Sequence, residues 1–231
     1  YQPSEIGLSP VGAENQPQKE KKEEAPVVIT GLTRAQAMKR PEFYGICFIA
    51  FGLSGACQGL YQHMAAYFTD IGYAQVRAAS FISIVGFTLA VGKIGAGWLT
   101  DKIGLHKCYI LLVGLSTVGI ILLNFSAVGP MAILACFLFG FAMAAPFVLS
   151  PLLTTFAFGS KDFANIYGTI TVFTFLGPIL MPPLAGLIYD QLGSYFLAFV
   201  VCGVIEAASL LIGAVILKSG GYEKLVAKGK A

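Results

Sequence analysis

The amino-acid sequence predicts an all-α transmembrane protein built as a six-helix bundle. Hydrophobic residues make up 56% of its 231 positions and charged residues only 12%, about half the charged share of a typical soluble domain. Long apolar stretches recur along the chain, without the period-2 alternation that marks a transmembrane β-barrel. These observations favour helices in a bilayer over a soluble hydrophobic core.

Six apolar stretches are long enough, or nearly so, to cross a hydrocarbon core of roughly 30 Å, which needs about 20 helical residues. They cover about residues 43–69, 78–99, 108–125, 130–158, 165–189 and 195–217. Residues 1–40 are polar and mixed in charge, which predicts a cytoplasmic linker that ends in a short amphipathic segment. We therefore expect the bundle at 41–217 and a cytoplasmic tail at 218–231. Prolines at positions 146, 151, 178, 182 and 183 are expected to interrupt the fourth and fifth spans.

The basic residues predict the orientation of the bundle. Thirteen of the 15 Lys and Arg residues fall in segments on one side of the predicted spans, while Arg77 lies on the other side and Lys93 within a span. Loops on the cytoplasmic side are enriched in Lys and Arg. We therefore expect a multi-pass protein of the plasma (cell inner) membrane with both termini of this segment in the cytoplasm.

Lys93 lies about four residues, roughly 6 Å, from the middle of the second span. A charge at this depth is costly and usually marks a pathway or a partner. Gly86, Ala90 and Gly97 share its helical face, so another helix or a ligand can approach the ammonium closely. Lys93 is therefore a candidate for binding an anion. The alternative is a side chain that extends along the helix to the headgroups.

Polar side chains also share one face of the first span. Gln58, Tyr61 and Gln62 follow the i, i+3, i+4 spacing that brings side chains together on a helix. Three polar groups on one side of a membrane helix need hydrogen-bond partners, which a hydrated cavity supplies. The alternative is a set of hydrogen bonds that hold neighbouring helices together.

Two ionisable residues within the spans are candidates for proton coupling. His63 lies in the first span, about 100° around the helix from the polar face, and Glu206 lies at the centre of the sixth span. The alternatives are a packed structural histidine and a hydrogen bond from Glu206 to a neighbouring helix.

The second span ends in a charged turn that contains Gly97, Asp101, Lys102, Gly104 and Lys107. Asp101 comes at the end of a predicted helix, where the helix dipole already places partial negative charge. A carboxylate is favourable there only if a cation or the N-terminus of another helix lies close. We therefore interpret the turn as a latch that forms in one conformational state, with an ordinary solvated basic loop as the alternative.

Motifs of enzymes and cofactor sites are missing from the sequence. It has no G-x-x-x-x-G-K-[ST] phosphate loop, catalytic triad or cluster of metal ligands. None of the five cysteines forms a C-x-x-C pair, so neither a zinc site nor a disulfide framework is suggested. We expect no enzymatic activity, no cofactor and no nucleic-acid partner.

The charged turn resembles the loop signature that follows the second helix of each six-helix half in the major facilitator superfamily. More of the chain resembles the monocarboxylate transporters and their oxalate/formate antiporter relatives, in "SIVGFTLAVGKIGAGWLTD", "FGFAMAAPFVLSPLL…FGSKDFANIYG" and "GPILMPPLAGLIYDQLGSY". The resemblance covers nearly all of the chain. It implies the C-terminal half of a twelve-helix fold, with residues 1–40 similar to the loop that joins the two halves.

The resemblance also implies roles for residues of the chain. Lys93 stands where the family carries a carboxylate-binding arginine, and Met143 and Phe147 match positions that line its pocket. Lysine keeps the charge but loses the bidentate fork of arginine. Proton-coupled members often carry an acid one turn before this cation, where the present sequence has Leu89. The oxalate-type relatives carry a second lysine in the eleventh helix, where Thr171 and Thr174 stand in this chain.

These expectations lead to a function. We expect secondary active transport of a small organic anion, a monocarboxylate, by alternating access, with proton coupling or exchange. The partners are then the small carboxylate substrate, the lipid bilayer and the N-terminal six-helix half of the same transporter. The alternatives are half of a dicarboxylate or oxalate-type antiporter, a non-transporting membrane receptor or scaffold, and a six-helix carrier that acts as a dimer.

Overall fold

The structure is a computed structural model that describes residues 30–227, except for the side chain of Glu223. Most of the expected linker and the last residues of the tail lie outside the described residues. The described part is helical, apart from short connections and one isolated bridge. Its helices are α1 (Arg34–Ala37), α2 (Pro41–Asp70), α3 (Gln75–Ile103), α4 (Leu105–Leu123), α5 (Gly129–Ala142), α6 (Ala145–Phe158), α7 (Phe163–Leu192), α8 (Phe196–Ser219) and α9 (Gly221–Ala227).

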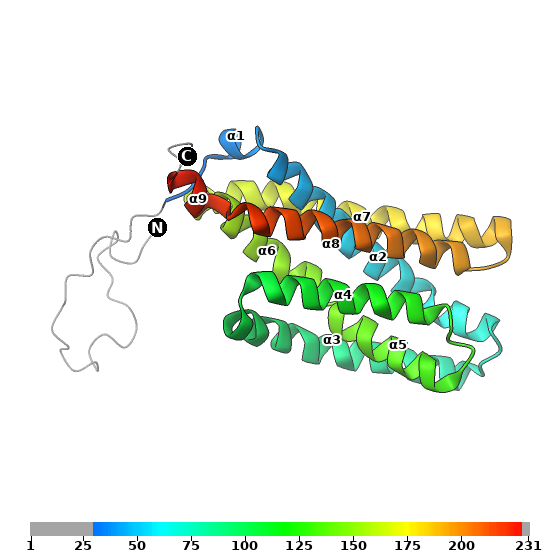
Figure 1. Cartoon of the computed structure of the whole chain (residues 1–231). Coiled ribbons are helices and arrows are strands. Elements are labelled where there is room, and N and C mark those ends of the chain that lie inside the picture. Colours follow the sequence, from blue (N-terminus) through cyan, green and yellow to red (C-terminus); the bar gives the residue numbers. More distant parts are fainter. Residues whose placement is uncertain (1–29, 228–231) are drawn as a thin grey trace, which may run out of the picture.

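Six helical units are long and apolar enough to cross a membrane, namely α2, α3, α4, α5 together with α6, α7 and α8. This confirms the predicted all-α transmembrane fold. The first and last described helices, α1 and α9, lie at the same end of the bundle, as six crossings require (Figure 1). We call this end the α1/α9 end.

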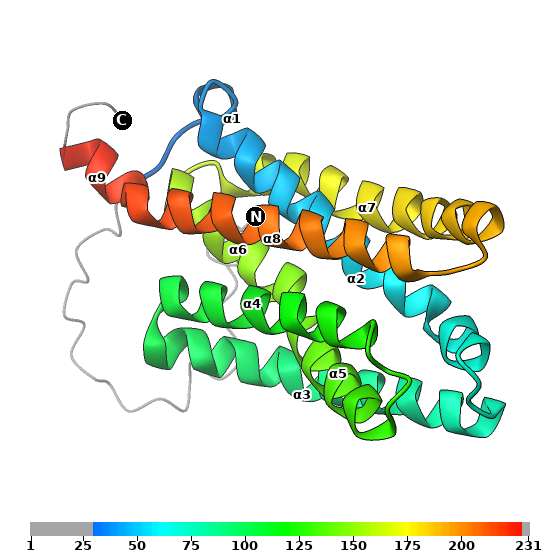
Figure 2. The ribbon, with the colours of Figure 1, turned by 45° about the vertical axis from the view of Figure 1, so that its right-hand side comes forward.

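The spans form two groups joined by α6. In both views α3, α4 and α5 lie on one side, α2, α7 and α8 lie on the other, and α6 runs between them (Figures 1 and 2). α2 is the most enclosed span, whereas most residues of the apolar windows of α3 and α7 remain uncovered within the described part of the chain. The bundle therefore has a buried centre around α2 and two flanking helices with open faces.

Glycines bring α2 and α7 into backbone contact. A Cβ atom on Gly55 would lie only 3.0 Å from the Cα atom of Gly177, and one on Gly59 would lie 3.0 Å from the Cβ atom of Met181. Small residues at such crossings let membrane helices approach closely, where van der Waals packing replaces the hydrophobic drive that lipid does not supply. The pair α2–α7 is thus packed too closely to accept larger residues at these positions.

The prolines act differently in the two spans that contain them. The fourth span is interrupted as expected, because α5 ends at Ala142 and α6 begins at Ala145, one residue before Pro146. The expected interruption of the fifth span is wrong, since α7 is continuous through Pro178, Pro182 and Pro183.

A hydrogen bond from another helix helps to explain why α7 continues. Pro178 has no N–H to donate to the carbonyl group of Thr174, four residues earlier. The hydroxyl group of Ser54 on α2 donates to that carbonyl at 2.7 Å. Neighbouring helices can re-satisfy backbone groups that proline frees in a membrane span.

The segment before α1 is attached to the loop between α6 and α7. The amide of Leu32 donates to the carbonyl group of Phe158 at 2.8 Å, and the amide of Ser160 donates to the carbonyl group of Thr30 at 2.9 Å. The amide of Arg34 donates to Oδ2 of Asp162 at 2.7 Å. We call this contact between residues 30–34 and 158–162 the clasp.

The clasp also stabilises the charged form of Asp162. A hydrogen bond from Asn165 Nδ2 (2.6 Å) and the bond from the Arg34 amide lower the pKa of the Asp162 carboxyl group from its ordinary value of 3.8. The carboxylate therefore holds the start of α1 and the first turn of α7 at neutral pH.

Candidate functional site

Lys93 lies on the exposed flank of α3, in the apolar middle part of the helix. Its ammonium nitrogen lies 4.8 Å from the centroid of the Phe147 ring on α6. A cation over an aromatic face is attracted by the ring quadrupole, typically by 0.5–1 kcal/mol at exposed sites. The structure thus brings together two residues to which the family resemblance assigns roles in substrate binding.

The helix break faces this part of α3. A Cβ atom on Gly92 would collide with the carbonyl oxygen of Phe141, and one on Gly95 would lie 3.3 Å from the Phe141 ring. Phe141 comes just before the turn at Met143 and Ala144 that separates α5 from α6. Irregular backbone at membrane depth is tolerated where it is buried in protein or lines a water-filled cavity. The Lys93 side chain and the interrupted backbone are therefore neighbours.

The helical face beside Lys93 is open. Cβ atoms built on Gly86 and Gly97 would meet no described atom within 4 Å, and Ala90 is exposed. This face offers room for a ligand or another helix, as the sequence predicts. Met143 differs, since its side chain is only 4% exposed and packs in the hydrophobic core. It offers little surface to a ligand, whereas Phe147 is 55% exposed.

The polar face of α2 is partly open. Gln58 and Tyr61 are half-buried and Gln62 is exposed. Within residues 30–227 none of these three side chains forms a hydrogen bond with another residue. The interhelical hydrogen bonds considered as an alternative role are therefore absent from this part of the chain, and the three groups are free to meet water or a ligand.

His63 is held between two neighbours. Its Nε2 atom lies 2.9 Å from the carbonyl oxygen of Pro182, and its Nδ1 atom lies 3.3 Å from the hydroxyl group of Tyr195. Because a carbonyl can only accept, Nε2 donates to Pro182, and in the neutral imidazole Nδ1 then accepts from the tyrosine. This arrangement matches the structural alternative for His63.

Glu206 is fully buried where α2, α4 and α8 meet. Its Oε1 atom accepts from the hydroxyl group of Ser116 at 2.9 Å and from the thiol of Cys57 at 3.6 Å. Its Oε2 atom is buried without a hydrogen-bond partner in the described part of the chain. The hydrogen bonds to neighbouring helices match the structural alternative, and the enclosed position separates Glu206 from the open flank that carries Lys93.

The charged turn is short and exposed. Gly104 is the single residue between α3 and α4, with φ +81°, and its amide donates to the carbonyl group of Thr100 at 2.9 Å. Only glycine adopts such a backbone angle without strain. The Lys102 ammonium lies 4.3 Å from the centroid of the Trp98 ring. Asp101 and Lys107 are exposed, and Asp101 has no partner among the described residues.

Some residues of the site were not anticipated. Gly92, Gly95 and Phe141 set the distance between α3 and the helix break, and Tyr195 holds the second ring nitrogen of His63. The i, i+3 glycine pair beside Lys93 was a usable signal for close helix packing. The contact between His63 and Tyr195 joins residues 132 positions apart, which no local pattern reveals.

Comparison with known proteins gives the family. The model of the Major Facilitator Superfamily matches residues 7–161 and 82–228. Monocarboxylate transporter 12 of Homo sapiens is 28% identical over 185 residues, which cover 78% of this chain and 34% of that protein. Monocarboxylate transporter 13 of Bos taurus is 30% identical over 165 residues, covering 68% of this chain and 36% of that protein. Monocarboxylate transporter 9 of Pongo abelii is 32% identical over 124 residues, which cover 53% of this chain and 24% of that protein.

The chain spans about a third of the length of the first two of these relatives. The family match covers most of the chain, and the six spanning helices make it an integral multi-pass membrane protein. The chain therefore belongs to the Major Facilitator Superfamily, a family of membrane transporters rather than enzymes, and its similarity within that family is to monocarboxylate transporters.

Proposed function

We propose that the chain is the C-terminal half of a secondary transporter that moves a small monocarboxylate by alternating access. The observation that carries this proposal is the Lys93 ammonium, which is exposed in an apolar helix and lies 4.8 Å from the Phe147 ring beside a helix break. Binding sites of secondary transporters commonly lie near the midplane at such interrupted helices. The curated relatives are named monocarboxylate transporters, which supports a carboxylate as the ligand.

In this proposal Lys93 attracts the carboxylate, and Phe147 contacts the apolar part of the substrate. Gln58, Tyr61 and Gln62 contribute polar groups from α2, since these side chains are free of hydrogen bonds within residues 30–227. Met143 supports the pocket from behind, because it is buried. At the matching positions of α7, Thr171 and Thr174 offer hydroxyl groups rather than a second cation, which favours a monoanion over a dicarboxylate.

The charged turn serves as a latch in the same proposal. Asp101 lies in the last turn of α3, has no partner among the described residues and is exposed. The companion N-terminal half would supply the cation or helix N-terminus that a carboxylate at this place needs. The excess of Lys and Arg at the α1/α9 end supports a cytoplasmic location for that end, and the membrane is proposed to be the plasma membrane.

Coupling to protons or exchange of anions would drive transport. His63 and Glu206 are the ionisable candidates in the spans, and both are already engaged by neighbouring groups. Leu89 occupies the position one turn before Lys93. We therefore propose that a coupling acid near the substrate, if protons are used, comes from the companion half.

Replacing Lys93 in the complete transporter tests the site. Lys93→Ala is expected to abolish saturable uptake of a radiolabelled monocarboxylate in liposomes, because no other described cation lies on this face of α3. Lys93→Arg should restore part of the uptake, since it keeps the charge. Lys39→Ala, at an exposed position before α2, is the control and should behave as the wild type. Unchanged uptake and KM in Lys93→Ala would overturn the assignment.

A further inference from the structure

A groove at the α1/α9 end is built from three parts of the chain that are distant in sequence. It has a volume of about 760 Å³ and lies between the turn of α3 and α4, the end of α6 and the junction of α8 and α9. His106, Lys107 and Lys224 contribute its polar side chains, while Ile110, Phe156 and Leu217 contribute apolar ones. The groove is separate from the Lys93 site, but two of its residues, Gly104 and Lys107, also belong to the charged turn proposed as a latch.

The polar side of this groove is cationic. Lys107 and Lys224 are exposed and come from α4 and α9. His106 adds an imidazole that can donate a hydrogen bond. No acidic side chain is among the described residues that line the groove. Gly104 is both the C-cap of α3 and the N-cap of α4, so the opposite partial charges of two helix ends meet at this turn and the lysines supply the positive field.

The apolar side of the groove continues onto the surface that faces lipid. Ile110 is 43% exposed and its neighbour Leu111 is 42% exposed. Trp98 and Lys102, in contact on the adjacent end of α3, form the kind of aromatic and basic pair found at the headgroup level of a bilayer. The groove therefore combines cations with an apolar wall at the boundary between membrane and water.

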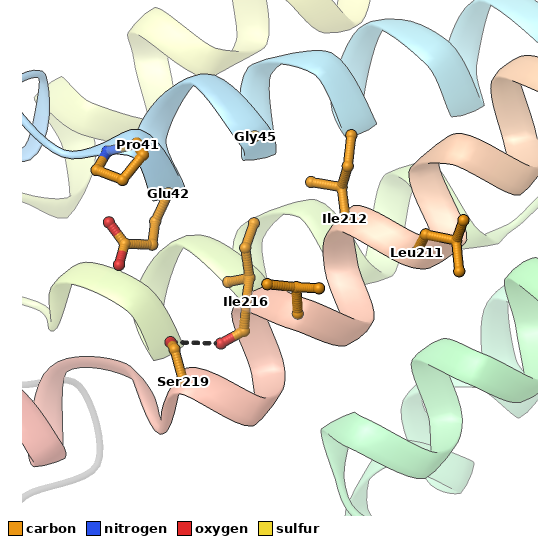
Figure 3. Close-up of a pocket in the computed structure, with 8 residues that line it drawn as sticks. Pro41, Glu42, Gly45, Leu211, Ile212, Ile216 and Ser219 are labelled. Atoms are coloured by element: carbon orange, nitrogen blue, oxygen red, sulfur yellow. Dashed lines mark hydrogen bonds between the residues drawn. The ribbon is translucent and has the colours of Figure 1, made fainter.

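Another groove at the same end has the opposite charge. It lies between α2 and α8, with a volume of about 360 Å³, and Glu42 points into it beside Ser219 (Figure 3). The Oε2 atom of Glu42 is buried without a hydrogen-bond partner in the described part of the chain. Each groove has its own apolar wall, and the two grooves differ in the sign of their charged side chains. They are therefore expected to select different headgroups.

We infer that the groove of His106, Lys107 and Lys224 binds the headgroup of an anionic phospholipid that carries exposed phosphate, with its acyl chains along the exposed side chain of Ile110. Basic pockets at the end of membrane helices are suited to such headgroups, and each lysine near the surface contributes about 1 kcal/mol. An apolar wall that opens to the bilayer favours a lipid over a freely dissolved phosphate. The inference uses the proposed orientation only to say that the lipid belongs to the cytoplasmic leaflet.

Titration of the full chain in neutral detergent tests this inference. The probe is dioctanoyl phosphatidylinositol 4,5-bisphosphate, and binding is followed at about physiological ionic strength, where distant surface charges are screened. The double variant Lys107→Gln/Lys224→Gln is expected to bind about 30-fold more weakly, which corresponds to about 1 kcal/mol for each lysine. The control Lys39→Gln/Lys161→Gln removes two exposed charges at the same end outside the groove and should change the affinity less than about twofold.

Further arms distinguish a lipid from a free phosphate. Inositol trisphosphate and inorganic phosphate should bind much more weakly than the lipid, and Ile110→Asp should weaken lipid binding without affecting the soluble headgroup. Equal loss in both double variants would indicate nonspecific charge and overturn the inference. Equal affinity for the soluble anions would also overturn it, in favour of a free-phosphate site. All four substituted lysines are exposed, and a wild-type melting temperature confirms folding. Anion uptake is not measured here, so a failure leaves the transport proposal untouched.

Discussion

The hydroxyl group of Ser54 replaces, from a different helix, a donor that Pro178 cannot supply. The Ser54 oxygen also lies 2.6 Å from the carbonyl oxygen of Ala50 on its own helix, so its single proton is shared between the carbonyl groups of Ala50 and Thr174. Serine commonly bonds back to its own helix in this way, but the bond to Thr174 links α2 to α7. A single hydroxyl group therefore affects the integrity of one helix and the packing of two.

Ser54→Ala is expected to lower the melting temperature of the chain in detergent by about 2–4 °C. The substitution leaves the half-buried Thr174 carbonyl without its donor, which costs about 1 kcal/mol, and a protein of this size loses about 2–4 °C per kcal/mol. Ser83→Ala is the matched control, because the Ser83 hydroxyl group bonds only to its own helix at an exposed position. Equal melting temperatures for Ser54→Ala and Ser83→Ala would contradict the proposed role of the bond.

At the scale of the elements, the clasp ties the start of α1 to α7 through one carboxylate. Its backbone bonds form in a narrow space, since a Cβ atom on Gly31 would lie 2.7 Å from the amide nitrogen of Lys161. Gly159 has φ +75°, which favours glycine. Two glycines and one aspartate thus allow the segment before α2 to lie against the loop between α6 and α7.

Asp162→Asn is expected to speed hydrogen exchange of the Arg34 amide several-fold at neutral pH. The pKa of Asp162 is lowered in the folded chain, so its contribution is present above the ordinary carboxyl pKa and is lost as the pH falls through the lowered value. The difference between wild type and variant should therefore be constant from about pH 5 to pH 8. Asp190→Asn, at an exposed position on the far end of α7, should exchange as the wild type. If the Arg34 amide of Asp162→Asn exchanged as slowly as in the wild type, the backbone hydrogen bonds of the clasp would be sufficient to hold the start of α1, and the proposed role of the carboxylate would be wrong.

At the scale of the whole molecule, the open faces of α3 and α7 distinguish this bundle from a soluble one. Phe87 and Ile94 on α3 and Phe175 and Ile179 on α7 are more than 60% exposed within the described residues. Lipid covers such surfaces in a membrane, and a companion half would cover others. The face of Gly86 and Gly97 is the one we assign to the companion half, because small residues there permit close helix approach.

Gly86→Leu tests whether lipid or the companion half covers this face of α3. In the chain alone it should leave the melting temperature unchanged or slightly raised, because a Cβ atom there meets nothing within 4 Å and leucine favours a helix. In the complete transporter it should reduce uptake, because the larger side chain obstructs the companion half. Gly114→Leu on α4 is equally unobstructed in the described structure and should leave uptake unchanged. Normal uptake by Gly86→Leu would place this face against lipid instead.

The fold was predictable because long apolar stretches must satisfy their backbone groups internally. Lys93 became a candidate binding residue because a charge is costly in such a stretch. The contact of Lys93 with Phe147 followed the family resemblance. Other features depended on contacts between distant residues. The continuity of α7 rests on Ser54, which lies 120 positions from Thr174, and the engagement of His63 rests on Tyr195. Local patterns report helix faces, but they do not report which faces meet.

The single glycine between α3 and α4 leaves these two helices very little freedom to move separately. Consecutive Cα atoms are 3.8 Å apart, so Ile103 and Leu105 stay within about 7.6 Å of each other whatever the bundle does. A displacement of the first turn of α4 must therefore be followed by the last turn of α3, which carries Asp101, although the dihedral angles of Gly104 can still change the angle between the helices. The ends of α3 and α4 at the charged turn therefore cannot separate, whichever conformational state the bundle adopts.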